Sequence, residues 1–594
     1  MLAEAIAPSP HAFGVAESFS GRRWRFQPAD AEVARSLSRS QNLSPLLCSL
    51  LLARGIAAAD VADYLNPTLK RLLPEPLLLA DMYKAVERAR AAIERRETIA
   101  IFGDYDVDGS CSAALLCEFL TGLGFRPRVY IPDRMTEGYG PNAPALLKLK
   151  QDGASLVITV DCGATAVDPL TAARDSGLDV IVLDHHAVEI PPPALAHVNP
   201  NQPGDTSGLY YLCAAGVTFL FVVALNRALR ASGWYAANGI PEPDLREHLD
   251  LVALATVCDV VPLLGINRAF VRSGLARLSM LSRPGFAALA SVANITPPCT
   301  PHHLGFVFGP RINAGGRVGR CSLGVELLTA KTGAEALAKA LDLHNKERRA
   351  IESTILDEAM AMAAAQPEAP ILVLDGDGWH SGVVGIIAGR VRERFGKPTF
   401  AIGFEGGLGR GSARSVPGFD IGALVRAARE QKILDSGGGH AMAAGVSLTR
   451  TQLGEFRAFV ASHDAAAASC SNAAKELTIE ALASAAGSSA ALVDEIARLG
   501  PFGAGNPEPL LAFADMRIAF AEIVGRDHVK LQLRGGDGAR LDAIAFRAAT
   551  APLGQGLLGA RGRPVHIAGR LQADEWNGSR RVQLHVEDAA AAGL

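Results

Sequence analysis

Residues 98–109 read TIAIFGDYDVDG, an apolar run that ends in three aspartates at alternate positions and a glycine. Two later stretches repeat this pattern, SLVITVDCG at 155–163 and LDVIVLDHH at 178–186. Sequence of helical or loop character separates them, including the apolar CSAALLCEFLTGLG at 111–124. Strands that alternate with helices in this way predict βαβ units and a parallel sheet.

Acidic residues and histidines gather where these strands are expected to end. They are Asp104, Asp106, Asp108, Asp161, Asp184, His185 and His186. Asp259 follows the apolar run LVALATVC and is interpreted as a fourth motif of the same kind. Because parallel strands end at one edge of a sheet, we expect these side chains to lie together. In an extended chain the first three aspartates would also point to one side.

So many carboxylates repel one another unless cations neutralise them. Carboxylates combined with histidine favour Mn²⁺ or Mg²⁺, and two such ions are the usual device for phosphoester hydrolysis. A calcium loop of the EF-hand type needs glutamate at its twelfth position, where this chain has Leu115. A simple acidic turn explains the first motif alone. The four motifs together predict a two-metal phosphohydrolase.

The rest of the chain divides by composition. We expect an N-terminal region at 1–80, the catalytic domain at 81–332, a connecting helix at 333–366, a smaller α/β domain at 367–466, and a linker with a barrel at 467–594. The connecting helix is predicted because 334–366 lacks Pro and Gly. The last region contains five short runs of period two, which is typical of an OB-type barrel.

Charge and cysteine content limit the function. The 58 basic residues are balanced by 61 acidic ones, so the chain is not expected to coat duplex DNA, and any polyanion site must be local. Nine cysteines without a C-x-x-C pair indicate a reducing compartment. The N-terminus lacks a basic region before an apolar core, and we found no apolar run of membrane-spanning length. We therefore expect a cytoplasmic protein with no membrane contact.

The motifs resemble those of a known family. DYDVDG, VDCG, DHH and ATVCDVVPL are similar to the four motifs of the DHH phosphoesterases. GPRINAGGR at 309–317 and SGGGHAMAAG at 436–445 resemble elements of the RecJ-type exonucleases and their DHHA1 domain, the former differing slightly from the more usual alanine-rich form. The resemblance runs from about residue 40 to the C-terminus. It implies an α/β fold in which a parallel-sheet DHH domain is joined by a long helix to a smaller α/β DHHA1 domain, followed by an OB-like β-barrel.

The resemblance also implies roles for residues at the matching positions. Asp161 would bridge two Mn²⁺ or Mg²⁺ ions, Asp108, His185 and Asp259 would complete one site, and Asp104 with Asp106 the other. His186 would contact the scissile phosphate. The further residues implied in phosphate or DNA binding are Arg311, Asn313, Arg317, Arg410, Ser412, Arg414, Gly438, Gly439 and His440. A structural ion pair is the alternative for Arg311.

The predicted barrel carries cations interleaved with an aromatic residue, as strand tracking and base stacking require. These are Arg526, His528, Lys530, Arg534, Trp576, Arg580 and Arg581, with a solvated barrel face as the alternative. Trp379 and His380 either stack a base or begin a helix, and His302 and His303 are expected in a loop or a substrate channel.

The function implied by the resemblance is a monomeric 5′-3′ exonuclease specific for single-stranded DNA that releases 5′-mononucleotides. It would act in DNA repair and recombination, including mismatch repair, with a single-strand-binding protein and a RecQ-type helicase as partners. Two alternatives stay open from the residues alone. One is a DHH phosphoesterase acting on short oligonucleotides or cyclic dinucleotides, and the other is a DNA-binding protein that has lost activity. The complete set of acidic motifs argues against the latter.

Overall fold

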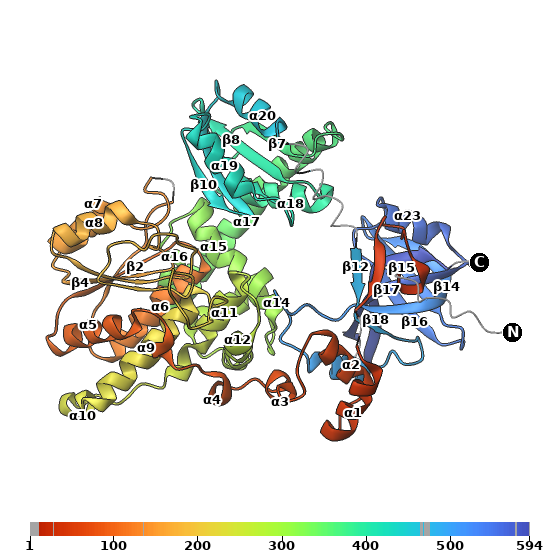
Figure 1. The fold of residues 1–594 in the computed structure, drawn as a ribbon, viewed down its shortest axis with the longest axis horizontal. Helices are drawn as coiled ribbons and strands as arrows, with labels where there is room; N and C mark the ends of the chain where they lie inside the picture. The colour runs from red at the N-terminus through yellow and green to blue at the C-terminus, as the bar shows by residue number, and fades with distance from the viewer. Residues whose placement is uncertain are drawn as a thin grey trace.

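The computed structural model describes residues 11–592 except 28, 135, 464–466, 468–475 and 577–578. Figure 1 shows a larger α/β body, a smaller α/β body above it and a β-barrel at the far side. Cys470 and most of the predicted linker fall outside the described residues.

The larger body is built on a five-stranded parallel sheet with the order β3-β2-β4-β5-β6. Its strands are β2 (Ile99–Gly103), β3 (Arg128–Tyr130), β4 (Leu156–Val160), β5 (Asp179–Leu183) and β6 (Ala196–Val198). All residues of β2 and β4 are buried, because helices cover both faces of the sheet. The predicted parallel sheet is confirmed.

Two groups of helices cover the sheet. On one face lie α5 (Met82–Glu94), α6 (Val107–Gly122) and α9 (Ala214–Ala231), and on the other α7 (Ala143–Gln151) and α8 (Val167–Asp175). Neighbouring residues of one strand therefore pack on opposite sides, as Ile101 and Phe102 do. Of the described helices, α9 alone has the length and apolar character of a membrane span, and 78% of it is buried inside the protein. It packs as a core helix.

The sheet is followed by a helical region. It contains α10 (Trp234–Asn238), η3 (Leu245–His248), α11 (Leu249–Cys258), α12 (Gly265–Leu278), α13 (Pro284–Ala293), α14 (Pro301–His303), the π-helix η4 (Leu304–Phe308), α15 (Gly309–Val318) and α16 (Leu323–Thr329). The strand expected before Asp259 is wrong, because LVALATVC forms the buried helix α11. A short apolar run does not distinguish a buried strand from a buried helix.

The connecting helix α17 (Ala334–Ala364) joins the two α/β bodies. Near its start, Ala338 and Leu341 belong to the core of the larger body. Towards its end, Ile355, Ala359 and Ala363 belong to a core of the smaller body. The predicted connecting helix is therefore present, and it contributes to the cores of both bodies.

The smaller body is a mixed sheet with the order β10-β11-β9-β8-β7. Its elements are β7 (Leu372–Asp377), α18 (Val384–Phe395), β8 (Thr399–Glu405), β9 (Leu408–Arg414), α19 (Ile421–Glu430), β10 (Ser436–His440), β11 (Ala443–Thr449) and α20 (Leu453–Ala461). The Gly-rich segments within 406–418 and 436–449 are strands rather than loops. They form β9, β10 and β11, which pair in antiparallel register, with Gly438 opposite Gly445.

The C-terminal strands close into a barrel. They are β14 (Leu511–Val524), β15 (His528–Arg534), β16 (Arg540–Ala545), β17 (Pro564–Trp576) and β18 (Ser579–Ala591), with α23 (Pro552–Gly559) between β16 and β17. Pairing of β14 with β17 closes the ring, which agrees with the predicted OB fold. Before them lie β12 (Glu476–Ile479), β13 (Ala481–Leu482) and α22 (Ala490–Ala497).

The N-terminal segment packs on this barrel rather than standing apart. It contains η1 (Ala12–Gly14), β1 (Arg23–Phe26), α1 (Ala31–Gln41), α2 (Pro45–Ala53), α3 (Val61–Leu65), α4 (Leu69–Leu72) and η2 (Pro76–Leu78). Strand β1 pairs with β12, and Trp24 donates a hydrogen bond of 3.0 Å to buried Asp588. Leu47 and Leu51 of α2 share the barrel core. The barrel body is therefore assembled from both ends of the chain.

Candidate active site and metal centre

The loop after β2 brings three aspartates to the edge of the sheet. Asp106 is the N-cap of α6, where its Oδ1 accepts a hydrogen bond of 3.1 Å from the Gly109 amide, and Asp108 lies in the first turn of the helix. The predicted extended arrangement of these aspartates is therefore wrong. The chain can fold back here because residue 109 is glycine, and a Cβ at that position would lie 2.4 Å from the carbonyl oxygen of Asp104.

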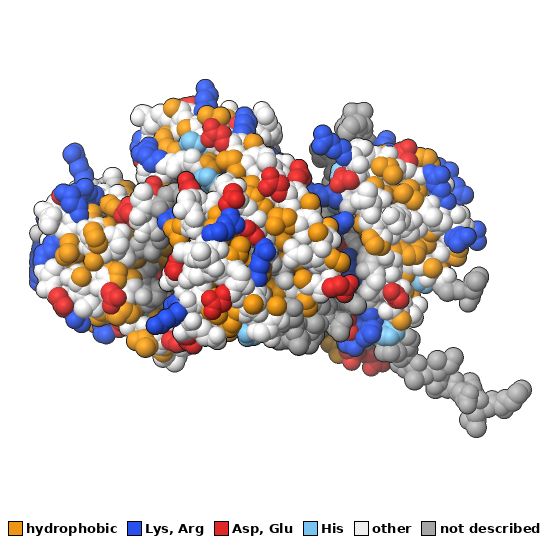
Figure 2. Space-filling view, turned by 90° about the horizontal axis from the view of Figure 1, so that it is seen from above, with side chains coloured by type: hydrophobic (Ala, Val, Ile, Leu, Met, Phe, Trp, Pro, Cys, Tyr) orange, Lys and Arg blue, Asp and Glu red, His pale blue; other side chains and the backbone are white. Residues whose placement is uncertain are grey.

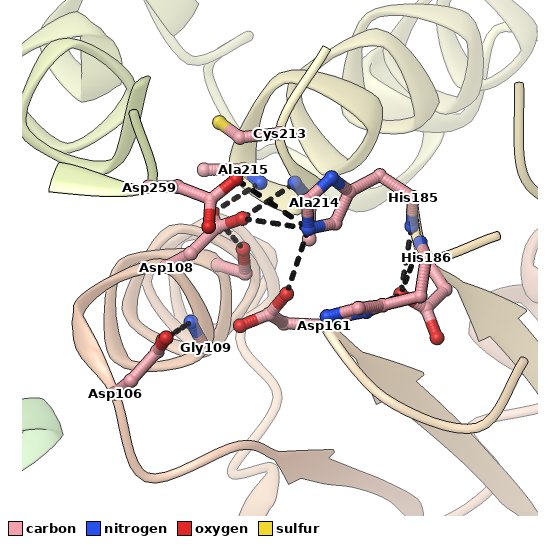
Figure 3. A network of polar contacts seen from close by, with 12 residues as sticks. Asp106, Asp108, Gly109, Asp161, His185, His186, Cys213, Ala214, Ala215 and Asp259 are labelled. Carbon is pink, nitrogen blue, oxygen red and sulfur yellow. Dashed lines mark hydrogen bonds and ion pairs between the residues drawn. The ribbon is translucent and has the colours of Figure 1, made fainter. Parts of the chain in front are cut away.

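Asp108 is fully buried and held by the N-terminus of α9. Its two carboxylate oxygens accept hydrogen bonds of 2.6 Å and 2.8 Å from the amides of Ala214 and Ala215. Figure 3 shows these bonds beside Asp259 and His185. A helix N-terminus stabilises a carboxylate, so the fold supplies this acid with partial positive charge. Asp108 is thereby fixed in position before any cation binds.

Asp161 follows strand β4, and the DHH segment, residues 184–186, follows strand β5. Asp161 has a φ of 60°, which is unusual for a residue other than glycine and typical of functional sites. Asp184 accepts a hydrogen bond of 2.7 Å from Nδ1 of His186 and further bonds from the His185 and Ala164 amides. Asp184 is therefore a positioning residue within the DHH segment.

The two histidines differ in charge. Burial and the neighbouring charge of His186 lower the pKa of His185 to about 4, so its imidazole is neutral and able to act as a ligand. Burial disfavours the charged form of His186 as well, but the hydrogen bond to Asp184 and its charge raise the pKa of His186 to about 9. At neutral pH this segment presents one neutral and one cationic ring.

Nε2 of His185 lies among three carboxylates from separate elements. It is 3.4 Å from Asp161, 3.8 Å from Asp108 and 3.6 Å from Asp259. Asp259 lies just beyond the C-terminus of α11, so a helix end completes the site where a strand end was predicted. The structure nevertheless brings Asp259 to the predicted place.

The ligand atoms form three groups that could hold a cation, and within each group they lie within 4.8 Å of one another. Two groups correspond to the predicted sites, Asp104 with Asp106 and Asp161, and Asp108 with His185 and Asp259. The third consists of Asp161, Asp184, His185 and His186. Among the described residues, buried atoms of Asp104, Asp161 and His185 have no hydrogen-bond partner. Such atoms are costly to bury without a partner. The donor set of carboxylates and one imidazole fits Mn²⁺ or Mg²⁺.

Charge repulsion within these groups supports the same fit. Burial, followed by repulsion from neighbouring carboxylates, raises the pKa of Asp108 to about 7 and that of Asp259 to about 9. It also raises the pKa values of Asp104 and Asp161 well above their usual range. The carboxylates are thus destabilised as anions in the protein alone, and divalent cations would remove that repulsion.

A pocket of about 420 Å³ between the two α/β bodies collects arginines. Its lining includes Arg134, Arg317, Ser381, Gly385, Arg410, Ser412, Arg414, Gly438 and Gly439. Burial, followed by the charges of Arg134 and Arg348, lowers the pKa of Arg317 to about 10. The N-terminus of α18 also lies at the pocket. Confined positive charge beside a helix N-terminus is suited to a phosphate group.

The pocket lies next to the metal-binding groups. Tyr105, between Asp104 and Asp106, is covered by Arg134, whose guanidinium lies 5.2 Å from the centre of the ring. A Cβ at Gly316 in α15 would lie 2.9 Å from the Tyr105 carbonyl oxygen. The aspartate loop, α15 and the arginine pocket are therefore in direct contact.

Several predicted residues lie elsewhere. Arg311 pairs with Asp342 of α17 at 2.9 Å and does not line the pocket, which is the alternative considered from the sequence. Asn313 is half-buried in α15, and His440 is exposed at the end of β10. Trp379 is buried and donates a hydrogen bond of 2.8 Å to Glu358, so it is not a base-stacking platform. Phosphate contact by Arg311, Asn313 and His440 stays a prediction.

Arg134 was missed in the sequence. It lies in the segment that follows β3, so the rule that ligands bind beyond the carboxyl ends of parallel strands would have selected it.

On the barrel, Arg526, Lys530, Arg534 and Arg581 are exposed, and Arg580 pairs with Asp494. His528 accepts a hydrogen bond of 2.9 Å from the Arg547 amide. The side chain of Trp576 lies outside the described residues.

The parallel sheet with its acidic edge, joined to a second body that contributes arginines, defines a phosphoesterase of the DHH class. The DHH family N-terminal domain matches residues 98–256, the DHHA1 domain 368–468, and the RecJ OB domain 479–588. The chain belongs to the RecJ family of single-stranded-DNA-specific exonucleases.

Similar proteins and solved structures support this assignment to the RecJ family. The single-stranded-DNA-specific exonuclease RecJ of Bacillus subtilis is 34% identical over 96% of this chain and 71% of the relative. The RecJ of Escherichia coli is 35% identical over 94% of this chain and 98% of the relative. The crystal structure of RecJ from Thermus thermophilus in complex with Mn²⁺ has a TM-score of 0.78 at 28% identity, covering 95% of this chain and 79% of that one. A second structure of that protein contains Mg²⁺.

Proposed function

We propose that this protein degrades single-stranded DNA from the 5′ end and releases 5′-mononucleotides by two-metal-ion hydrolysis. The observation that carries this proposal is the contact between the arginine pocket and the metal-binding groups around Tyr105. The pocket is large enough for a phosphate group. A terminal phosphate can end in it, whereas an internal phosphodiester would need an exit for the chain on each side of the phosphate. An end that is held beside the catalytic groups is cut at the neighbouring linkage.

The side chains divide the chemistry between them. Asp104, Asp106 and Asp161 would hold one cation, and Asp108, His185 and Asp259 the other. Divalent cations, when bound, supply a water of lowered pKa and neutralise the charge of the phosphate. His186, kept cationic by Asp184, would donate a hydrogen bond to a non-bridging oxygen of the scissile phosphate. The buried ligand Asp108 keeps its orientation through the α9 amides.

The pocket would select the 5′ end. Arg317, Arg410 and Arg414 supply positive charge, Ser412 a hydroxyl group, and β10 a backbone edge at Gly438. A terminal phosphate monoester carries more charge than a phosphodiester and should bind this pocket more strongly.

The barrel would hold the remaining strand. Figure 2 shows basic and acidic side chains interspersed over one face of the molecule, which does not suit coating of duplex by bulk charge. Exposed cations on β15 and its flanking turns, such as Lys530 and Arg526, would track the backbone of a single strand.

The cellular setting follows as part of the same proposal. The protein would act as a monomer in the cytoplasm during DNA repair and recombination. A single-strand-binding protein and a RecQ-type helicase would be its partners, since they supply and protect single strands.

Labelled oligonucleotides test the proposal. Single-stranded DNA that carries a label at either the 5′ or the 3′ end is incubated with the protein and Mn²⁺, and products are resolved over time. We expect the 5′ label to appear first, as a mononucleotide. Release of the 3′ label first, or cleavage only of dinucleotides and cyclic dinucleotides, would contradict the proposal and favour the small-substrate alternative.

A further inference from the structure

We propose that Tyr139 is a positioning residue of the catalytic centre, which holds the backbone of Asp161 and the ring of His186 in place. This inference rests on the proposed exonuclease function and deepens it. It assigns the orientation of the carboxylate between the two predicted cation sites to a hydroxyl group outside the ligand set. No sequence motif assigned a role to Tyr139.

The hydroxyl of Tyr139 reaches two segments of the catalytic centre. It donates a hydrogen bond of 3.1 Å to the backbone carbonyl of Asp161 and lies 3.3 Å from Nδ1 of His186. Nδ1 of His186 donates its own hydrogen bond to Asp184, at 2.7 Å, so the tyrosine hydroxyl proton is left for the Asp161 carbonyl. The rings of Tyr139 and His186 also meet edge to face, with centroids 5.8 Å apart and planes 72° apart. One side chain therefore contacts both the segment after β4 and the segment after β5.

The backbone of Asp161 needs support because its conformation is strained. Its φ of 60° is one that a residue other than glycine rarely adopts. Such a conformation persists only where the surrounding structure holds it. The Asp161 amide donates a hydrogen bond of 3.0 Å to the Leu183 carbonyl, and the Asp161 carbonyl accepts the bond from Tyr139. The two hydrogen bonds hold Asp161 on both sides of its Cα atom.

The carboxylate of Asp161 has no comparable support. Its buried Oδ1 has no hydrogen-bond partner among the described residues, whereas the carboxylate of Asp108 is held by two backbone amides of α9. The direction of the Asp161 side chain is therefore set through its backbone. Loss of the Tyr139 hydrogen bond would release that backbone at the carboxylate that lies between the two predicted cation sites.

The segment that carries Tyr139 is itself anchored. The Glu137 carboxylate accepts hydrogen bonds of 2.7 Å from the hydroxyl of Tyr130 on β3 and 3.2 Å from the side chain of Asn142, the N-cap of α7. The same segment presents Arg134 to the arginine pocket. It therefore serves the phosphate pocket through one residue and the metal-binding groups through another, and the two roles can be separated by substitution.

The variant Tyr139→Phe removes the hydroxyl and keeps the ring. Because the side chain is 51% exposed, we expect the melting temperature in chelator to equal that of the wild type. A calorimetric titration with Mn²⁺, in the absence of DNA, should give the wild-type number of ions and an affinity about tenfold weaker, because a group that orients a metal ligand has been lost. Tyr83→Phe is the matched control, since Tyr83 is an exposed tyrosine on α5 outside the catalytic centre.

Steady-state kinetics provide a second readout. A 5′-phosphorylated single strand is cleaved at saturating Mn²⁺ by the wild type, Tyr139→Phe and Tyr83→Phe. We expect kcat of Tyr139→Phe to fall about tenfold and KM to stay within about twofold, because the residues of the phosphate pocket are unchanged. Tyr83→Phe should match the wild type in both constants.

The outcomes separate this inference from the proposed function. Wild-type Mn²⁺ affinity in Tyr139→Phe would refute the inference, because the hydroxyl would then not orient Asp161. An unchanged kcat would also refute it, and a raised KM in its place would show that Tyr139 contacts the substrate instead. A lower melting temperature in chelator would indicate a general structural role and would equally refute it. If the wild type releases no 5′ nucleotide, the proposed function fails, while the titration without DNA still tests the inference.

Discussion

Oδ1 of Asp161 lies 3.4 Å from Nε2 of His185, so the carboxylate of Asp161 connects the two groups of metal-binding side chains. Asp161 belongs to one group by its contacts with Asp104 and Asp106, and it approaches the other through the imidazole. A single carboxylate between two cation sites couples their occupation. This relationship makes Asp161 the residue whose loss should affect both sites.

Two neighbouring glycines provide a matched test of the phosphate pocket. A Cβ at Gly438 would have no atom within 4 Å, whereas one at Gly439, with a φ of 151°, would lie 2.4 Å from the Ala443 carbonyl oxygen. We expect Gly438→Ala to keep the wild-type melting temperature and to raise KM for 5′-phosphorylated DNA several-fold, because the methyl group occupies pocket space. Gly439→Ala should lower the melting temperature. Equal melting temperatures for the two variants would contradict the close approach of Gly439 to the Ala443 carbonyl oxygen.

Selection of the 5′ phosphate should depend on Arg414. Its guanidinium is held by hydrogen bonds to the Ser412 hydroxyl and the Ala413 carbonyl, at 3.1 Å and 2.9 Å. We expect Arg414→Ala to reduce kcat/KM for 5′-phosphorylated strands about tenfold to a hundredfold, which corresponds to a charge-assisted hydrogen bond. Strands with a 5′ hydroxyl should change little. Arg390→Ala, on the same body but outside the pocket, is the control, and an equal loss on both kinds of strand would refute the assignment.

Stability of the DHH domain should depend on Glu118. Its carboxylate contacts Arg283 at 2.8 Å, Lys331 at 2.8 Å and His248 at 3.4 Å, which joins α6 to the N-terminus of α13. Burial opposes its charge, but the hydrogen bonds and ion pairs of these residues hold the pKa of Glu118 well below its usual range. We expect Glu118→Gln to lower the free energy of unfolding by about 2 kcal/mol at pH 7, because buried Arg283 loses one of its two carboxylate partners and keeps only Asp250.

The same residue predicts a pH dependence. Since the pKa of Glu118 is lower in the folded state, its contribution is complete above the unfolded pKa of about 4.3 and decreases as the pH falls below that value. The difference in melting temperature between wild type and Glu118→Gln should therefore be constant from pH 8 to pH 6 and shrink towards pH 4. A difference that grows on acidification would contradict this sign.

Lys530 tests the barrel. It is exposed on β15, opposite Glu522 of β14 and Ile544 of β16. If Lys530 contacts one phosphate, Lys530→Ala should weaken binding of all single strands alike and reduce the slope of log affinity against log salt by about 1. Lys84→Ala, on α5 of the other body, should leave the slope unchanged. An unchanged slope for Lys530→Ala would remove this residue from the DNA path.

Much of the fold could be predicted because its signals are local. The continuous apolar runs of β2 and β4 and the uninterrupted α17 follow from burial and helix propensity alone. The chemistry of the metal ligands was also visible, because acidic residues at strand ends have few structural uses. The geometry of these ligands could not be predicted, since Asp259 lies just beyond the end of helix α11 and Asp106 is the N-cap of helix α6.

What could not be predicted depends on contacts between distant segments. Packing of α2 on the barrel joins residues more than 400 positions apart, and no local pattern specifies that. The segments of β9 and β10 lack the β-branched residues that mark strands, yet their pairing with β11 makes them part of a sheet. Arg311 could have met a phosphate or a carboxylate, and only the position of Asp342 on α17 decides between them in this structure.

The most direct test of the account is a calorimetric titration of the metal-free protein with Mn²⁺, paired with cleavage of a 5′-labelled single strand, in the wild type and in Asp161→Ala. We predict two ions per chain in the wild type. In Asp161→Ala we predict at least one ion fewer and a loss of cleavage of a thousandfold or more, with an unchanged melting temperature in chelator. Two tightly bound ions in Asp161→Ala, or cleavage within tenfold of the wild type, would contradict the shared role of Asp161 and with it the two-metal centre.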